Sequence, residues 1–288
     1  MKNAPMGGER RTAAMVNWYF PRTLDEAVVY LEREKTIPHG GGTGLLKRGL
    51  GGVDGLVDLS RLPLDYLRAE DGQVEIGASR TFAAAARDLG KLLPGTIMEK
   101  ALGSAASTPL RNRITVGGSV SLLPPWSDLI GPLAVLNGHV VTEGRNGGTF
   151  SLPSWLEKSR QFLKGSLVTS VAFPDAAGWL SFYYREVRTA ADYPAFTVSI
   201  LLKKSEGAVR EARIAVSGGV DRVVRLGSLE ERLAGWETLP GPPPETGSLA
   251  AVQFARKPAG SPGYLSEMAA LRVRRGLEVL LAGEEGGA

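Results

Sequence analysis

A glycine-rich segment constrains this chain more than any other feature. Residues 36–49 read TIPHGGGTGLLKRG, and every position from Gly40 to Gly44 is glycine except Thr43. Glycine lacks a Cβ and accepts positive φ, so such a loop can turn successive backbone N–H groups inward. Inward N–H groups form a concave anion site, typically for a diphosphate. We therefore predict a diphosphate-binding loop, with a flexible surface loop as the alternative.

The residues before this loop predict a helix and then a strand. Residues 23–26 (TLDE) form a capping-box pattern, and the apolar spacing that follows predicts a helix to about Glu34. Residues 36–38 then read as a short strand leading into the glycines. A Rossmann motif differs, because a long helix follows its loop directly, whereas Gly49, Gly51 and Gly52 disfavour one here. A P-loop is excluded because no Gly-Lys-Ser/Thr closes the motif.

The composition narrows the chemistry that the chain can perform by itself. It contains no cysteine and only two histidines, His39 and His139. Disulfides, thiolate-held zinc and cysteine-ligated iron–sulfur clusters are therefore excluded within the chain, and we predict no metal site. If the chain takes part in redox chemistry, an organic cofactor must carry the electrons.

Charge and hydropathy exclude further classes. The net charge of +4 is spread over the chain rather than clustered, which does not indicate nucleic-acid binding. No apolar run approaches the ~20 residues of a membrane span. The first residues lack the apolar region of a signal peptide. We therefore expect a cytoplasmic protein.

Hydrophobic patterns predict two folded parts that meet near residues 174–178. In the first part, strands and helices are mixed. Residues 111–120 (RNRITVGGSV) read as a strand leading into a tight Gly-Gly turn. The remaining expected elements are strands at 55–60, 74–78, 139–143 and 167–173, and helices at 81–93, at 96–102 and ending near 136.

The second part shows strands first and helices afterwards. Residues 180–187, 196–204 and 209–217 read as three consecutive strands of an antiparallel sheet. A helix begins at Ser228, residues 241–244 form a loop, and a long helix covers residues 264–281. Strands followed by helices predict an α+β fold.

Two motifs carry a family resemblance. Residues 40–45 read GGGTGL, and residues 111–119 read RNRITVGGS, with Asp128 shortly after. With this spacing, the chain resembles the FAD-binding (medium) subunit of the molybdenum hydroxylases, which include carbon monoxide dehydrogenase and xanthine dehydrogenase. The resemblance covers residues from about 18 to about 281.

The resemblance implies an α+β fold with a PCMH-type FAD-binding domain over residues 16–176. This domain has two α/β subdomains, at about 16–62 and 63–176, and follows a flexible leader at residues 1–15. Residues 177–288 would form a C-terminal domain of a three-stranded antiparallel sheet with helices, which closes over the flavin.

The resemblance also implies a non-covalent FAD and the residues that hold it. The glycine loop would bind the diphosphate, the second motif would line the flavin side, and Asp128 would bond the ribityl chain or a nearby hydroxyl. No side chain is predicted to be catalytic. The implied cofactor residues are His39, Gly40, Gly41, Gly42, Thr43, Gly44, Leu45, Thr115, Gly117, Gly118, Ser119, Asp128, Val168, Tyr184, Arg185 and Tyr193.

The chain departs from the family pattern at three positions. Ser119 replaces a common asparagine, Ile114 replaces a glycine, and Tyr184 stands where a lysine is frequent. Other residues admit a second interpretation. His39 is either loop structure or a covalent flavin anchor, and Asp128 either contacts the cofactor or caps the following helix. Tyr193 either packs internally or stacks on the flavin, and Trp126 either fills the core or faces a partner.

The implied function is electron transfer within a larger enzyme. An iron–sulfur subunit would deliver electrons that a large molybdopterin-binding subunit takes from substrate, and this chain would pass them to NAD, oxygen or a quinone. Two alternatives remain open. One is a self-contained flavin oxidase or dehydrogenase of the vanillyl-alcohol oxidase type, and the other is an assembly module without flavin.

Overall fold

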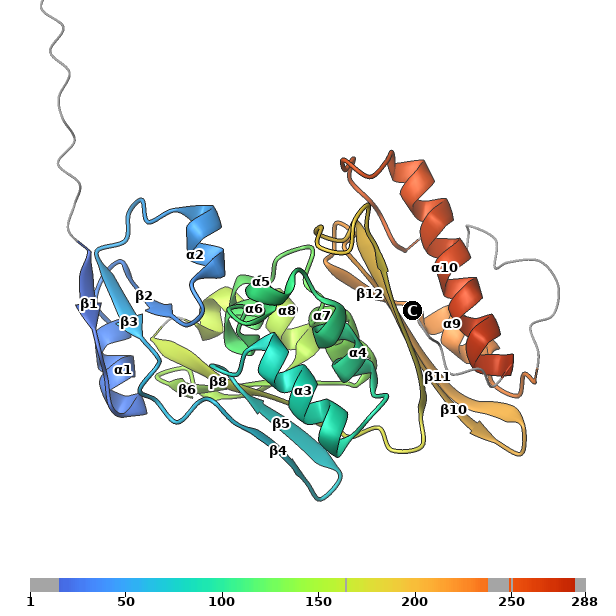
Figure 1. The fold of residues 1–288 in the computed structure, drawn as a ribbon, viewed down its shortest axis with the longest axis horizontal. Helices are drawn as coiled ribbons and strands as arrows, with labels where there is room; N and C mark the ends of the chain where they lie inside the picture. The colour runs from blue at the N-terminus through green and yellow to red at the C-terminus, as the bar shows by residue number, and fades with distance from the viewer. Residues whose placement is uncertain (1–15, 164, 238–248, 250, 283–288) are drawn as a thin grey trace, which may run out of the picture.

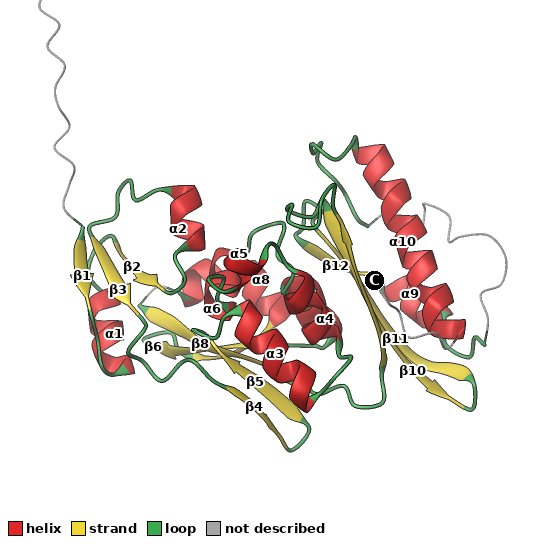
Figure 2. Cartoon of the chain, viewed as in Figure 1, coloured by secondary structure: helices red, strands yellow, loops and turns green. Residues whose placement is uncertain are grey.

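The computed structural model describes residues 16–163, 165–237, 249 and 251–282, and it contains three β-sheets with helices packed between and around them (Figures 1 and 2). The expected leader at 1–15 and the expected loop at 241–244 lie outside the described residues. No helix in the described part is long and apolar enough to span a membrane.

The first sheet is small and parallel. It contains β1 (Asn17–Tyr19), β2 (Thr36–His39) and β3 (Gly55–Asp58) in the order β1-β3-β2. Helix α1 (Leu24–Leu31) lies between β1 and β2 in sequence. The Thr23 hydroxyl caps its start as expected, accepting a hydrogen bond from the Glu26 N–H at 3.2 Å. The Glu26 carboxylate accepts from the Arg22 N–H at 2.7 Å rather than from the Thr23 N–H of a complete capping box. Helix α2 (Thr43–Arg48) follows the glycine loop.

The second sheet is antiparallel, with strand order β4-β5-β8-β6-β7. Its strands are β4 (Leu67–Glu70), β5 (Gln73–Gly77), β6 (His139–Gly144), β7 (Gly148–Ser151) and β8 (Ser166–Pro174). The helices of this part are α3 (Phe82–Leu92), α4 (Ile97–Ser104), α5 (Thr108–Arg111), α6 (Val116–Leu122), α7 (Ile130–Val135) and α8 (Leu152–Phe162). Helices α3, α4 and α7 lie between this sheet and the third one (Figure 1).

The third sheet confirms the antiparallel C-terminal unit and adds a strand to it. The predicted strands are β9 (Leu180–Glu186), β10 (Phe196–Ser205) and β11 (Ala208–Ser217), and the short β12 (Val223–Arg225) makes four. Helices α9 (Gly227–Arg232) and α10 (Pro262–Ala282) complete this unit, and α10 packs along β9 and β10. The opposite face of the sheet contacts α4 and α7.

The buried apolar residues form two clusters, one on each side of the third sheet. The cluster that lies between α10 and the sheet contains Phe196, Leu265 and Val273. The larger cluster fills the part of the chain before the third sheet, and it includes Tyr183 and Leu201 from the sheet's other face. The third sheet is therefore packed on both faces, which fixes the C-terminal unit against α4 and α7.

Residues 111–120 differ from the expected strand and tight turn. Helix α6 begins at Val116, and the Thr115 hydroxyl caps it by accepting from the Gly118 N–H at 3.2 Å. Both Gly117 and Gly118 lie in the first helical turn. The first N–H groups of a helix have no acceptor within the helix. The Thr115 hydroxyl supplies an acceptor for one of them, the Gly118 N–H, so the helix can begin at this glycine pair.

Candidate functional site

The glycine-rich loop joins β2 to α2 at one edge of the first sheet. Its backbone turns at Gly42, where φ is 78°. Helix α2 contains only six residues and ends at Gly49, with φ of 76°. The first turn of α2 includes Thr43, Gly44 and Leu45, so the loop and the start of the helix form one continuous run of backbone amides.

These amides are available to a ligand. Within the described part of the chain, no hydrogen-bond acceptor is assigned to the N–H groups of residues 40–45. Free amides in a turn and at a helix start carry partial positive charge. The loop can therefore bind an anion without any side chain changing its partner.

The loop rests on the segment that precedes α6. A Cβ on Gly41 would lie 1.5 Å from the Arg113 carbonyl oxygen, and one on Gly40 would lie 3.1 Å from the Thr115 hydroxyl. The Arg113 guanidinium donates through Nε to the Gly41 carbonyl at 3.1 Å. Two motifs far apart in sequence are thus in direct contact, and glycine is required at Gly41 because backbone occupies the Cβ position.

Arg113 brings a positive charge to the loop. Its side chain is exposed, and its Nη2 would lie 3.8 Å from a Cβ on Gly42. The sequence did not single out Arg113, because a lone arginine in a loop usually contacts only solvent. Its neighbour Arg111 is used internally, donating to the Ala105 and Ala106 carbonyls at 2.8 Å.

The second glycine pair differs from the first in that its amides are occupied. Gly117 N–H donates to the Ala78 carbonyl at 2.8 Å, and Gly118 N–H donates to Thr115. A Cβ on Gly117 would lie 2.6 Å from the Ala78 Cβ. Gly117 therefore allows α6 to approach β5 closely. The buried Ser119 follows Gly118 directly in the same helix.

His39 and Val168 both pack against other protein residues. The His39 ring packs edge-on against Trp18 with centroids 4.9 Å apart, and its buried Nδ1 lies 3.8 Å from the Asp58 carboxylate. That nitrogen has no hydrogen-bond partner among the described residues. Val168 is buried on β8 in the main core.

Asp128 is buried and connects the two large units. Its Oδ1 accepts from the Tyr183 hydroxyl at 2.7 Å and from Arg185 Nε at 2.6 Å. Burial raises the pKa of the Asp128 carboxyl, while the Arg185 charge and both hydrogen bonds oppose that rise. Asp128 does not cap α7, since Leu129 is the N-cap residue.

Tyr184 and Arg185 point to opposite faces of the third sheet, as neighbours on a strand must. Arg185 faces Asp128, whereas the Tyr184 ring lies under the Arg272 guanidinium of α10 at 4.4 Å. The Tyr184 hydroxyl donates to Glu186 at 3.2 Å. The structure thus brings Arg185 to the site and leaves Tyr184 on the far face. Tyr183, which was not predicted, occupies the near face instead.

Three residues from three parts of the chain contact one another next to the segment that carries Asp128. The rings of Trp126 and Tyr193 lie 4.8 Å apart, and the Lys47 ammonium of α2 lies 3.5 Å and 4.4 Å from their centroids. Tyr193 is 58% exposed. Cation–π contacts of this kind attract the lysine to both rings. Lys47 carries no local sequence signal, because its partners are remote in sequence.

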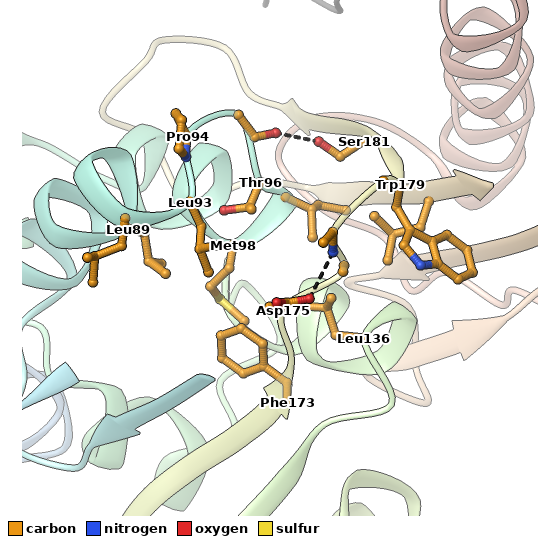
Figure 3. Close-up of a pocket in the computed structure, with 17 residues that line it drawn as sticks. Leu89, Leu93, Pro94, Thr96, Met98, Leu136, Phe173, Asp175, Trp179 and Ser181 are labelled. Atoms are coloured by element: carbon orange, nitrogen blue, oxygen red, sulfur yellow. Dashed lines mark hydrogen bonds between the residues drawn. The ribbon is translucent and has the colours of Figure 1, made fainter. Parts of the chain in front are cut away.

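The cavity in Figure 3 lies elsewhere. It has a volume of about 250 Å³ and lies between the end of α3, the start of α4 and the start of β9, with Leu89, Met98, Phe173 and Trp179 among its apolar lining residues. The Ser181 hydroxyl donates to the Gly95 carbonyl at its rim at 2.8 Å. No residue of the glycine loop or the second motif lines it, so it is separate from the candidate site.

Comparisons with known proteins identify the family of this chain. Residues 14–176 match the family described as the FAD binding domain in molybdopterin dehydrogenase. The glyceraldehyde dehydrogenase medium chain of Sulfolobus acidocaldarius is 28% identical over 227 residues, which cover 74% of this chain and 79% of that protein. The carbon monoxide dehydrogenase medium chain of Hydrogenophaga pseudoflava is 25% identical over 237 residues, covering 76% and 79%.

Solved structures share the fold over nearly the whole chain. Carbon monoxide dehydrogenase from Hydrogenophaga pseudoflava superposes with a TM-score of 0.80 at 24% identity, covering 92% of this chain and 98% of that one. Quinoline 2-oxidoreductase from Pseudomonas putida 86 gives 0.82 at 19% identity, covering 94% and 99%. The chain therefore belongs to the family of FAD-binding domains of molybdopterin dehydrogenases, a family of oxidoreductase components whose cofactor is FAD.

Proposed function

We propose that this chain is the FAD-binding subunit of a molybdopterin-dependent dehydrogenase. It accepts electrons from an iron–sulfur partner subunit and passes them to an acceptor such as NAD. The observation that carries the proposal is the loop at residues 40–45, whose free amides lie beside the Arg113 guanidinium. Family membership supports FAD as the ligand of that loop.

The loop fits the diphosphate of FAD. Amide donors without acceptors, a helix start and a nearby guanidinium all favour a negatively charged group. The glycines leave room for it, because the loop presents backbone rather than side chains on this side. Arg113 would add a charge-assisted hydrogen bond, and it already holds the loop in place through Gly41.

Residues further along the site fit the remainder of the cofactor. Thr115, Gly118 and Ser119 lie at the start of α6, next to the loop. The rings of Trp126 and Tyr193 offer apolar surface for an isoalloxazine, and Lys47 offers a positive charge near them. When bound, FAD supplies the redox chemistry, and the chain binds it, orients it and shields it from water.

The absence of cysteine supports placing the iron–sulfur clusters on a partner subunit. A relay of iron–sulfur clusters needs cysteine ligands, and this chain has none. The relatives named as medium chains support the same division of labour among subunits. We propose an iron–sulfur subunit and a large molybdopterin-binding subunit as the partners.

Co-expression tests the proposal directly. The chain is tagged and expressed with a cysteine-rich small subunit and a molybdopterin-type large subunit from neighbouring genes, and the complex is captured and its metals are counted. We expect a three-protein complex whose bound FAD is reduced by NADH. Capture of the chain alone, together with oxidation of a small substrate at ordinary rates of about 1–10³ s⁻¹, would favour a self-contained oxidase instead.

A further inference from the structure

Arg185 links the Asp128 carboxylate to two backbone carbonyls of a single loop through one guanidinium. Its Nε donates to Asp128 Oδ1 at 2.6 Å, its Nη1 to the Ala190 carbonyl at 2.9 Å, and its Nη2 to the Asp192 carbonyl at 3.0 Å. The side chain is only 7% exposed. Each of its nitrogens is therefore committed to the protein, which argues against direct contact between Arg185 and a ligand.

Two of these bonds hold the connection between β9 and β10. This connection covers residues 187–195, and we refer to it as the 187–195 loop. At its C-terminal end, the loop is held by the Ala195 N–H, which donates to the Glu186 carbonyl at 2.8 Å, and by Lys257, which donates to the Ala195 carbonyl. In its middle, the other contacts lie within the loop: the Asp192 N–H donates to the Thr189 carbonyl, and Arg188 lies 3.5 Å from the Asp192 carboxylate with 69% of its side chain exposed. The buried guanidinium of Arg185 is thus the main inward attachment of the loop's middle.

The same loop carries Tyr193 to the site. Its ring lies 4.8 Å from Trp126, which is only two residues before Asp128. Arg185 therefore binds the segment that carries Trp126 at one end of its guanidinium and the loop that carries Tyr193 at the other. The relative position of the Trp126 and Tyr193 rings therefore depends on Arg185, because a planar guanidinium fixes the directions of all its donors.

We propose that Arg185 is a positioning residue, which holds the 187–195 loop over Trp126 and thereby slows release of FAD from the site. The assignment rests on the proposed function, since the ligand is the FAD of that site. Lysine at this position would keep a charge for Asp128 but has no planar fork to reach both loop carbonyls. A lysine substitution therefore separates the ion pair from the attachment of the loop.

Three variants of the full chain test this. Arg185→Lys removes the loop attachment, and Asp128→Asn alters the ion pair but leaves both carbonyl bonds. Arg188→Lys is the matched control, because it makes the same change at an exposed position of the same loop. Trypsin cleaves after arginine and lysine, so the site after residue 188 survives in every variant. Cleavage there, under conditions in which thermal unfolding shows each variant folded, reports opening of the loop.

We expect Arg185→Lys to be cut after residue 188 at least about tenfold faster, because local opening controls proteolysis of a folded chain. FAD release, followed by recovery of flavin fluorescence on dilution, should also be at least about tenfold faster, since such changes act mainly on dissociation rates. Arg188→Lys should match the wild type in FAD release, and its cleavage is not compared because the change alters the bond that trypsin cuts. Asp128→Asn should keep the slow cleavage.

Each contrary result has its own meaning. The assignment would be overturned if Arg185→Lys were cleaved and released FAD at the wild-type rates. It would also be overturned if cleavage became faster while the rate of FAD release stayed unchanged. If Asp128→Asn opens the loop equally, the ion pair holds the loop and the assignment to the carbonyl bonds is wrong. A wild-type chain that binds no FAD would refute the proposed function. The proteolysis measurement needs no cofactor, so it still tests whether Arg185 holds the loop in that case.

Discussion

Replacing Gly42 by valine tests the diphosphate loop most directly. Gly42 has φ of 78°, a left-handed conformation that L-residues rarely adopt. Holding a non-glycine residue there costs about 1–3 kcal/mol, and a β-branched side chain is the least tolerant. A Cβ would also lie 3.0 Å from His39 Nε2. The loop should relax away from its present conformation, which misdirects its amides.

The effect on FAD affinity follows from the hydrogen bonds that the loop would make. A hydrogen bond to a charged group contributes about 1.5–3 kcal/mol. Loss of two such bonds therefore costs about 3–6 kcal/mol, which corresponds to a roughly 100- to 20,000-fold weaker Kd at about 1.4 kcal/mol per tenfold. Titration of apoprotein with FAD, followed by quenching of flavin fluorescence, measures this directly.

Gly49→Val provides the matched control. Gly49 has φ of 76°, and a Cβ there would meet nothing within 4 Å. Gly49 lies at the other end of α2, and its ψ of 172° gives a conformation that only glycine readily adopts, so valine costs at least as much there. Denaturant unfolding should show a loss of stability in Gly49→Val at least as large as in Gly42→Val, with weaker FAD binding only in Gly42→Val. Equal FAD affinities in the two variants, within about threefold, would refute the assignment of the diphosphate to this loop.

Three further predictions concern the cofactor link, the second glycine motif and alkaline stability. Acid precipitation should release FAD into the supernatant, whereas colour in the pellet would show a covalent link and point to His39. Gly117→Ala should cost about 1–3 kcal/mol of folding stability through the contact with Ala78, yet weaken FAD binding less than Gly42→Val; a stable variant that has lost FAD would contradict this. Burial and the hydrogen bond to Glu75 raise the pKa of Tyr66 from 10.0 to about 12. The folded state therefore retains this proton longer than the unfolded state, so the stabilisation is complete below pH 10 and is lost as pH rises to about 12. Denaturant unfolding of Tyr66→Phe should lose less stability over this interval than the wild type, and parallel losses would show that Tyr66 is not responsible.

Much of the fold could be predicted because its determinants are local. Thr23 caps the start of α1 as expected, and Thr81 likewise caps α3 by accepting from the Ala84 N–H. Alternating apolar residues predicted the three long C-terminal strands. The short β4, β7 and β12 were not predicted, because a strand of three or four residues depends mainly on its neighbours in the sheet.

Only part of the candidate site could be predicted from the sequence, for a similar reason. Tyr184 and Tyr183 are adjacent, and the alternation of a strand requires them to face opposite sides. Which one faces Asp128 is decided by how the third sheet packs on α7 and α10. Lys47 and Arg113 also gain their roles from partners remote in sequence, namely the two aromatic rings and the glycine loop.

The sequence by itself determined that two backbone segments, at residues 40–44 and 117–118, must be glycine-rich, and the family pattern follows from their spacing. Only the tertiary structure decided how they differ. The first loop keeps its amides free, whereas Gly117 donates to Ala78 and packs against it. A glycine permits both close packing and ligand binding equally, because all that it supplies is the absence of a side chain. Which of the two occurs depends on the groups that folding brings against it.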